Sequence, residues 1–393
     1  MRVLHVVQPF LRISENWIYP QVMRVPGVEP GVLTSERENE PQFPAEGIHF
    51  IHNPPRWSQG AGLPRLFNSL CFRLGRGAVV ATMAARRWQP DLIHAHFGQN
   101  GWEMLELRRQ LGVPLVCSFY GMDAWQLPFT QPLWIERYRG LFAEGALFLV
   151  EGPAMRGRLV AIGCPPEKVR ICRIGVPVEN LPFTAQPAAT PLRIVMIARF
   201  VEKKGFEDGL AACAAARKLG TDLTVEIIGD GTDAVGQRIK SQLQLLAASS
   251  ELEGRVKFHG FLKPAEARAV ICASDVFLCP SKLSSDGDAE GGSPVALTEA
   301  MALGLLCIGT RHCDIPEVIR DGETGLLADS GDVAGLAALI ARASAAPTEM
   351  LVLRRRGREH IVANFSSAQQ LQDLRTAYDE LRGPAGLPRT RGV

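Results

Sequence analysis

Short apolar stretches rich in β-branched residues alternate along the chain with longer segments whose apolar residues recur at helical spacing. This alternation is typical of parallel sheets whose strands are connected by helices. The first half contains candidate strands at residues 3–7, 48–51, 92–96, 114–119, 147–151 and 169–173. The second half contains them at residues 192–198, 223–229, 255–260, 275–280 and 305–310. Each half therefore has enough strands for its own doubly wound α/β sheet.

A proline-rich stretch separates the two halves. Prolines at positions 177, 182, 187 and 191 stop helices and hold the residues before them extended. We therefore place a linker at about residues 180–190, between Rossmann-like domains over residues 1–185 and 186–365. Residues 366–393 contain a last helical pattern, with an N-cap candidate in Ser366 or Ser367 and an end at Gly383, followed by a tail that we expect to be disordered. One destination for this helix is the surface of the N-terminal domain.

The composition fits two globular domains of ordinary character. A chain of 393 residues, 46% of them hydrophobic, is too long for one ordinary core. Lys and Arg number 43 and Asp and Glu number 41, so the formal charge is +2. This balance gives no global reason to expect nucleic acid as a partner.

The sequence also indicates where the protein resides. The opening MRVLHVVQPF lacks the uninterrupted apolar stretch of a signal peptide, and no segment reaches the roughly 20 apolar residues that span a bilayer. The cysteines form no C-x-x-C pair, and we expect them to be buried, reduced thiols. They stand at positions 71, 117, 164, 172, 213, 272, 279, 307 and 313. We expect a cytoplasmic protein whose contact with a membrane, if it makes one, is at the inner surface.

Two open sheets joined by a linker form a central cleft lined by the carboxyl ends of their strands. Arg199 ends the strand at 192–198, and Lys203, Lys204 and Gly205 follow in the loop before a helix. Cations at a strand end and beside a helix N-terminus can neutralise a diphosphate without a metal ion. A solvated basic loop is the plain alternative for the Lys-Lys-Gly sequence alone.

A glycine-rich loop further along carries a second candidate group. Glu290 lies in this loop, beside Gly291 and Gly292, and Glu299 lies on the helix that follows. Carboxylates accept hydrogen bonds from vicinal hydroxyls, and glycines let backbone N–H groups approach a charged ligand. The group therefore indicates a nucleotide-sugar pocket, although either glutamate alone could be a loop or surface charge.

These segments, taken in order, resemble family 4 of the retaining glycosyltransferases, which have the GT-B fold. The resemblance spans about residues 190–330 and rests on ARFVEKKG, IIGDG, FHGF, PS, EGGSPVALTEAMA and DIPEVIRDGETGLL. It implies two Rossmann-like domains that face a central cleft. It also implies a nucleoside-diphosphate sugar bound mainly by the C-terminal domain, and transfer of that sugar with retained anomeric configuration and without a cofactor or metal ion.

The resemblance assigns roles by position. Arg199 and Lys204 would hold the diphosphate, Glu299 the ribose, Glu290 with Gly291 and Gly292 the donor sugar, and Gly260, Phe261 and Leu262 would border the base. Arg199, Lys204 and Glu290 are thus the candidate catalytic residues. Family members commonly have seven residues between the two glutamates, whereas this chain has eight, GGSPVALT. Retention is thought to proceed by attack on one face within an ion pair, with the leaving phosphate taking the acceptor's proton.

The N-terminal half supplies the expected acceptor side. His96 ends the strand at 92–96, and Tyr120 and Asp123 follow the strand at 114–119, so all three are placed at the mouth of the cleft. For His96 a structural role in the core is an equal alternative, and His94 is expected in the core. Family members often have histidine where Tyr120 stands. The SENWI segment at residues 14–18 resembles the opening of exopolysaccharide-building members, which implies a glycan or lipid-linked oligosaccharide acceptor.

Further features of the sequence allow other interpretations. Residues 63–88 carry apolar positions beside several arginines and could lie on anionic lipid, although a solvated helix face is the plainer interpretation. GDGTDA at residues 229–234 fits a dinucleotide-binding pattern, but the acidic residue expected after the next strand is missing. An epimerase of the same fold and a catalytically silent nucleotide-sugar-binding protein are the remaining alternatives.

Overall fold

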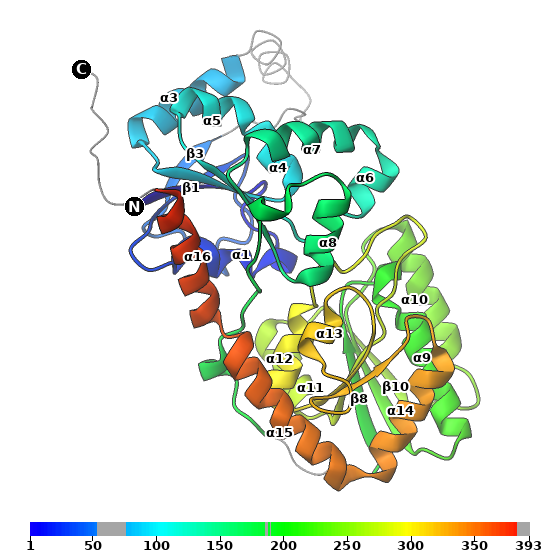
Figure 1. Cartoon of the computed structure of the whole chain (residues 1–393). Helices are drawn as coiled ribbons and strands as arrows, with labels where there is room; N and C mark the ends of the chain where they lie inside the picture. Colours follow the sequence, from blue (N-terminus) through cyan, green and yellow to red (C-terminus); the bar gives the residue numbers. More distant parts are fainter. Residues whose placement is uncertain (53–75, 185–187, 189, 383–393) are drawn as a thin grey trace.

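The computed structural model describes residues 1–52, 76–184, 188 and 190–382, which form two α/β domains (Figure 1). The first domain contains a seven-stranded sheet in the order β3-β2-β1-β4-β5-β6-β7, and the second a six-stranded sheet in the order β10-β9-β8-β11-β12-β13. Neighbouring strands in both sheets are parallel. In each sheet the order reverses beside the first strand, so each has the Rossmann-like arrangement that the sequence predicts.

Each predicted strand has a counterpart in the structure. The first sheet contains β1 (Arg2–Val6), β2 (Glu29–Thr34), β3 (His49–His52), β4 (Leu92–His96), β5 (Leu115–Ser118), β6 (Leu147–Val150) and β7 (Val169–Ile171). The second contains β8 (Leu192–Ile197), β9 (Leu223–Ile228), β10 (Val256–Gly260), β11 (Val276–Cys279), β12 (Leu306–Thr310) and β13 (Leu326–Ala328). The pattern does not predict β2 or β13, because β2 opens with Glu-Pro-Gly and β13 has three residues.

Helices cover both faces of each sheet (Figure 1). Those of the first domain are α1 (Ile18–Met23), α3 (Arg76–Trp88), α4 (Gly98–Glu103), α5 (Leu105–Leu111), α6 (Gln126–Thr130), α7 (Leu133–Glu144) and α8 (Pro153–Ala161). Those of the second are α9 (Phe206–Lys218), α10 (Ala234–Ala247), α11 (Pro264–Cys272), α12 (Val295–Leu303), α13 (Ile315–Val318), α14 (Val333–Ala345) and α15 (Pro347–Asn364). Because both faces are covered, strands such as β4, β5 and β12 are buried at every residue.

The last helix, α16 (Ser367–Leu381), belongs to the N-terminal domain although it follows the C-terminal one in sequence. Ser366 is its N-cap and accepts a hydrogen bond from the backbone of Gln369. Leu374 and Tyr378 pack in one core cluster with residues of the N-terminal sheet, and α16 lies beside α1 (Figure 1). The helix thus takes the destination considered from the sequence, and it completes the cover over one face of the first sheet.

The chain crosses between the domains twice, and the two crossings touch. Val176 N–H donates to the carbonyl of Phe365 at 2.8 Å, and Ser367 N–H donates to the carbonyl of Val176 at 2.9 Å. Val176 and Leu181 already pack in a core cluster of the second domain. The first crossing therefore lies just after β7, earlier in the chain than the linker expected at residues 180–190. The proline-rich stretch is extended chain that already packs on the second domain.

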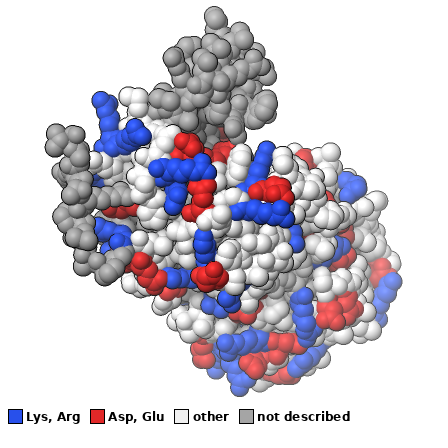
Figure 2. Space-filling view, turned by 45° about the horizontal axis from the view of Figure 1, so that its top comes forward, with Lys and Arg blue, Asp and Glu red and all other residues white. Residues whose placement is uncertain are grey.

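Charged side chains of both signs lie on the surface of the molecule. On the face drawn in Figure 2, basic and acidic side chains of the described residues are interspersed.

Six of the predicted buried thiols are buried, but Cys272 is exposed and Cys313 is half-buried, which corrects that expectation. Cys71 lies outside the described residues. Cys272 is the last residue of α11, whose buried residues are Ala267 and Ile271.

Two observations bear on membranes. Among the described residues no single helix has the length and apolar composition to cross a bilayer, and only α14 and α15 taken together, bent by 106°, meet both criteria. Of the segment at 63–88, residues 63–75 lie outside the described residues. The remainder is α3, whose Ala85 and Trp88 pack into the N-terminal core while Arg86 and Arg87 are exposed.

Candidate active site

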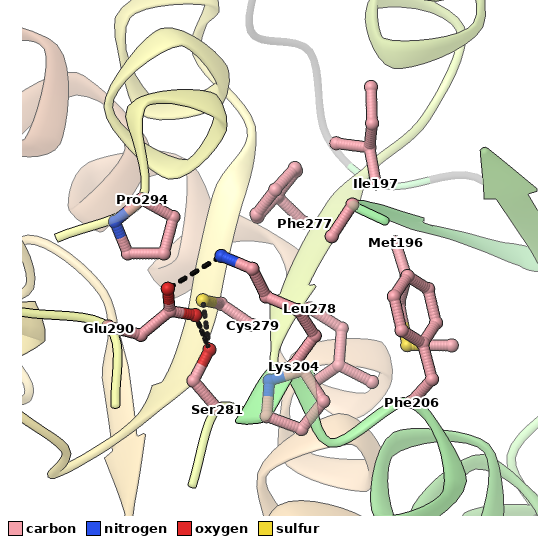
Figure 3. A pocket seen from close by; sticks show the side chains of 12 residues that line it. Met196, Ile197, Lys204, Phe206, Phe277, Leu278, Cys279, Ser281, Glu290 and Pro294 are labelled. Carbon is pink, nitrogen blue, oxygen red and sulfur yellow. Dashed lines mark hydrogen bonds and ion pairs between the residues drawn. The ribbon is translucent and has the colours of Figure 1, made fainter. Parts of the chain in front are cut away.

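The centre of the site is an ion pair between Lys204 and Glu290 (Figure 3). Lys204 Nζ lies 2.6 Å from Glu290 Oε2, and Ser281 Oγ donates to Oε1 at 2.6 Å, so both carboxylate oxygens are occupied. The Glu290 side chain is only 4% exposed. Burial opposes its ionisation, but the charges of Lys204 and Lys203 outweigh this effect and lower the pKa of Glu290. Glu290 is therefore a buried, ionised carboxylate held by Lys204 and Ser281.

The backbone around Lys204 depends on a glycine. Lys204 ends a short 3-10 turn after β8, and Gly205 follows with φ at +63°, at the start of α9. A Cβ at Gly205 would lie 1.9 Å from the carbonyl oxygen of Pro280. Only glycine fits both the positive φ and this approach, which brings the loop after β8 against the loop after β11.

Further contacts fix these two loops to each other. Lys203 Nζ lies 3.0 Å from the carboxylate of Asp288 and 2.9 Å from the carbonyl of Ala289. The hydroxyl of Ser285 donates to the carboxylate of Glu202 at 2.6 Å. Lys203 therefore binds the loop that carries Glu290, whereas Lys204 pairs with the Glu290 side chain itself.

Arg199 is a cation of the site for which the described residues supply no hydrogen-bond or ion-pair partner. It follows β8 and is exposed, and within the described residues its guanidinium makes no hydrogen bond or ion pair. It lies close enough to Glu15 of the N-terminal domain that its charge, after that of Arg12, partly offsets the rise in the pKa of Glu15 caused by burial. Arg199 thus faces the N-terminal domain and is free to meet an anion.

The residues expected around the nucleoside lie on neighbouring elements. Phe261 is 59% exposed, and Gly260 accepts a hydrogen bond from the backbone of Gly229 at 2.8 Å. Glu299 is half-buried on α12, where burial raises its pKa and Arg268 partly offsets the rise. Leu262 packs against the same core cluster as α12.

The N-terminal candidates are enclosed by their own domain in this structure. His96 is fully buried, which favours the core role that is the equal alternative from the sequence. Its Nδ1 lies 2.7 Å from the Tyr120 hydroxyl, and its Nε2 lies 3.1 Å from Nδ1 of His5. Burial lowers the pKa of His96, so the ring is neutral at pH 7. His96 points inward because all of β4 lies between covering layers.

Asp123 is likewise a fully buried carboxylate. It accepts backbone hydrogen bonds from Gly98 at 2.8 Å, Tyr120 at 3.0 Å and Gly121 at 3.1 Å. Burial raises its pKa to about 6, although these N–H groups oppose the rise. The role of Asp123 is to shape the turn at Tyr120 and Gly121, which faces the C-terminal domain.

Three histidines form a cluster next to this turn. The candidate ligand nitrogens of His5, His94 and His96 lie within 4.8 Å of one another, a set that could hold a metal ion. His94, buried as predicted, places its nitrogens 2.6 Å from the Tyr378 hydroxyl and 2.8 Å from the Ser118 hydroxyl. Hydrogen bonds therefore already account for both nitrogens of His94 and of His96.

Glycines bring the two domains into contact at the Glu290 loop. A Cβ at Gly291 would lie 2.5 Å from Cα of Gly121, and one at Gly292 would lie 2.1 Å from Oε2 of Glu151. Gly291 and Gly292 thus allow a close approach of their backbone to the N-terminal domain, whereas the approach to a charged ligand that the sequence predicts for them stays a prediction.

Asp314 joins the domains at a neighbouring point. It follows β12, and its carboxylate accepts hydrogen bonds from the backbone N–H of Ala154 at 2.7 Å and of Met155 at 3.4 Å, at the start of α8. Burial raises the pKa of Asp314 to about 6. A residue of one domain thus caps a helix of the other.

Sequence reasoning missed Ser281, His312 and Glu151. His312 accepts a hydrogen bond from the backbone of Glu290 at 3.5 Å, and burial lowers its pKa. Ser281 and His312 follow β11 and β12, so the rule that site residues follow strands could have found them. The dinucleotide-like segment has a structural role, since Asp233 caps α10 by accepting from the backbone of Gly236 at 2.8 Å.

The chain is similar to known proteins in sequence and in fold. The family model for Glycosyl transferases group 1 matches residues 178–360, and that for Glycosyltransferase Family 4 matches residues 23–180. The putative colanic acid biosynthesis glycosyltransferase WcaL of Escherichia coli (strain K12) is 33% identical over 294 residues, covering 74% of this chain and 70% of that protein. The amylovoran biosynthesis glycosyltransferase AmsK of Erwinia amylovora is 33% identical over 279 residues, covering 70% and 67%.

Solved structures match the fold over nearly the whole chain. HepE of Anabaena, solved in complex with UDP, has a TM-score of 0.78 at 15% identity and covers 97% of this chain and 100% of that one. Sucrose-phosphate synthase from Thermosynechococcus elongatus has a TM-score of 0.78 at 17% identity and covers 97% and 99%. The two facing Rossmann-like domains are those of the GT-B glycosyltransferases. The chain belongs to the glycosyl transferases group 1, which confirms the family resemblance of its motifs.

Proposed function

We propose that this glycosyltransferase moves a sugar from a nucleoside-diphosphate sugar to a hydroxyl of a surface polysaccharide or its lipid-linked precursor, with retention of anomeric configuration and without a metal ion. The observation that carries the proposal is the arrangement of Lys204, Arg199 and Glu290 at the carboxyl edge of the C-terminal sheet. Arg199, Lys204 and Glu290 are the catalytic residues of this proposal. Gly291 and Gly292 face the sugar, Glu299 the ribose, and Gly260, Phe261 and Leu262 the base.

The two cations would act on the leaving group. Breaking the bond between the anomeric carbon and the diphosphate leaves negative charge on that group, so fixed positive charges stabilise the transition state more than the ground state. Arg199 has no protein partner within the described residues, and Lys204 is already held 2.6 Å from Glu290. Two prepositioned cations supply the charge that a metal ion would otherwise bring.

Glu290 fits a role other than covalent nucleophile. Both its oxygens are engaged, by Lys204 and by Ser281, and its pKa is lowered. A carboxylate in this state orients Lys204 and can accept a hydrogen bond from a sugar hydroxyl. We propose that the leaving phosphate takes the acceptor's proton, so that no dedicated base is required.

The relatives supply the substrate classes. WcaL and AmsK carry the names of colanic acid and amylovoran biosynthesis, both of them polysaccharides, and HepE has been solved with UDP and with UDP-glucose. We propose a donor of the same chemical class and a growing glycan as acceptor. A lipid-linked acceptor would bring this enzyme to the inner surface of the membrane from the cytoplasm.

Thermal unfolding with UDP, GDP and ADP, each added separately, tests the donor site, because a ligand bound only by the folded state raises its stability. We expect a rise in Tm with one nucleotide that persists in EDTA. Incubation with the matching nucleotide sugar and glycan acceptors, followed by NMR of the product, then gives the anomeric configuration. No rise with any nucleotide, or an inverted product, would contradict the proposal, and an epimerised nucleotide sugar would indicate the alternative of the same fold.

A further inference from the structure

Glu151 is a carboxyl group on the N-terminal side of the cleft that no motif assigns. It is the first residue after β6, at the carboxyl edge of the first sheet. Its side chain reaches the loop of the other domain, since a Cβ at Gly292 would lie 2.1 Å from Oε2 and 2.4 Å from Cδ of Glu151. The carboxyl group therefore lies directly against the backbone of the loop that carries Glu290.

The charges around Glu151 are mostly of its own sign. Burial raises its pKa, the nearby carboxylates of Asp314, Glu290 and Asp123 raise it further, and Lys204 partly offsets the rise. Lys204 is already paired with Glu290 at 2.6 Å. Across the part of the chain that the structure describes, no hydrogen bond to the Glu151 carboxyl group is found. Glu151 is half-buried, so its carboxyl group keeps some contact with water and has hydrogen-bonding capacity left for a ligand hydroxyl.

Other polar groups converge beside it. Glu151 lines a small pocket with Gln21, Ser118, Tyr120 and Gln370. Gln21, Ser118 and Gln370 are each buried, at 2%, 4% and 4% exposure, and come from α1, β5 and α16. Hydroxyls and amides both donate and accept hydrogen bonds, which is the chemistry that recognises a sugar. Phe119, Leu149, Val150, Cys172 and Ile174 complete the lining, so the carboxyl group stands where a pocket of mixed polar and apolar character meets the Glu290 loop.

We propose that Glu151 is a specificity-determining residue that hydrogen-bonds a hydroxyl of the transferred donor sugar, from the side of the cleft opposite Lys204 and Glu290. This assignment rests on the proposed function and adds to it a sugar contact made by the N-terminal domain. The donor is favoured over the acceptor because Glu151 touches Gly292 and lies within electrostatic reach of Lys204 and Glu290, all assigned to the donor. The sugar would enter when the contact between Glu151 and Gly292 opens.

Binding of the whole donor and of its nucleotide part separates this role from a general one. Calorimetry with UDP and with UDP-glucose, or with GDP and GDP-mannose if GDP gives the larger Tm shift, measures the two affinities in the wild type, E151A and E151Q. We expect E151A to weaken nucleotide-sugar binding about tenfold and leave nucleotide binding unchanged. E151Q retains hydrogen-bonding atoms in the same place and should recover most of the loss. Glu167→Ala, which removes an exposed carboxylate of the same domain, should change neither affinity.

The outcomes separate the two proposals. If the wild type binds the nucleotide sugar and E151A retains the same ratio of the two affinities, Glu151 makes no donor-sugar contact. Equal weakening of both ligands, with a lowered Tm in E151A and in E151Q, would show a role in folding alone and would also overturn the assignment. If the wild type binds no nucleotide or nucleotide sugar, the proposed function itself fails.

Discussion

Both sides of the cleft have polar residues at or after the carboxyl ends of strands, but the surroundings of these residues differ between the two domains. On the C-terminal side, residues that follow the strands, such as Arg199, Lys204 and Glu290, meet at the carboxyl edge of the sheet as charged groups. On the N-terminal side, His96 and Asp123 also end or follow strands, but both are fully buried and hydrogen-bonded inside the domain. Burial alone does not separate the two sides, because Glu290 is also buried; the C-terminal side differs in having Lys204 paired with this carboxylate and Arg199 exposed at the same edge.

The largest effect should come from removing the central cation. In K204A the leaving diphosphate loses a fixed charge and Glu290 loses its ion-pair partner, so we expect nucleotide-sugar turnover to fall roughly 10²–10³-fold. A coupled assay of nucleotide release measures this rate. Lys218→Ala, at a lysine whose side chain is 68% exposed on α9, is the matched control and should leave turnover unchanged. Normal turnover in K204A would show that this charged residue of the C-terminal side is not needed for transfer, which contradicts the comparison.

A histidine on the other side should matter for stability. H96A leaves the Tyr120 hydroxyl and Nδ1 of His5 without their partner inside the core, so we expect unfolding free energy to fall by about 2–4 kcal/mol. Urea denaturation measures the change. His49→Ala, at an exposed histidine of the same sheet, should change it by less than about 1 kcal/mol. Equal losses in the two variants would show that the buried network contributes nothing particular.

The smallest effect concerns pH and the contact between the domains. Because burial raises the pKa of Asp314 to about 6 from 3.8, the folded protein binds this proton more tightly than the unfolded chain. The resulting stabilisation is complete below about pH 3.8 and is lost as pH rises through 6. D314N should therefore show a smaller fall in unfolding free energy between pH 4 and 7 than the wild type, by at most a few kcal/mol. Asp329→Asn, with its side chain 79% exposed, should follow the wild type, and identical profiles in all three proteins would exclude this role for Asp314.

Most of the fold could be predicted from the local pattern of apolar and polar residues. Strands with apolar, β-branched residues, such as β8 and β9, were predictable because burial on both faces requires that composition. Strand β2 was not, since Pro30 and Gly31 contradict strand propensity and only pairing with β1 and β3 holds the segment extended. The position of α16 depends on contacts with residues more than 200 positions away, such as Tyr378 with His94.

The candidate site was predictable where its residues lie on motifs of the family. Lys204 and Glu290 come from two segments that both carry family motifs, so their association follows from the fold. Glu151 and Asp314 meet groups of the opposite domain, and no pattern within one segment reports on such a meeting. His96 was placed at the mouth of the cleft because it ends a strand, but a position at a strand end does not tell how deeply the covering layers bury the side chain.

The hydrogen-bonded crossings at Val176 and at Phe365–Ser367 restrict how the cleft can open. A single connection would leave the domains free to swivel in any direction about it. Two adjacent connections that are hydrogen-bonded to each other oppose twisting of one domain relative to the other. The motion that remains is a hinge rotation about the axis that passes through both connections. Substrates would then enter at the edge remote from this axis, and each closure would return Gly291 to Gly121 and Gly292 to Glu151 in the same register.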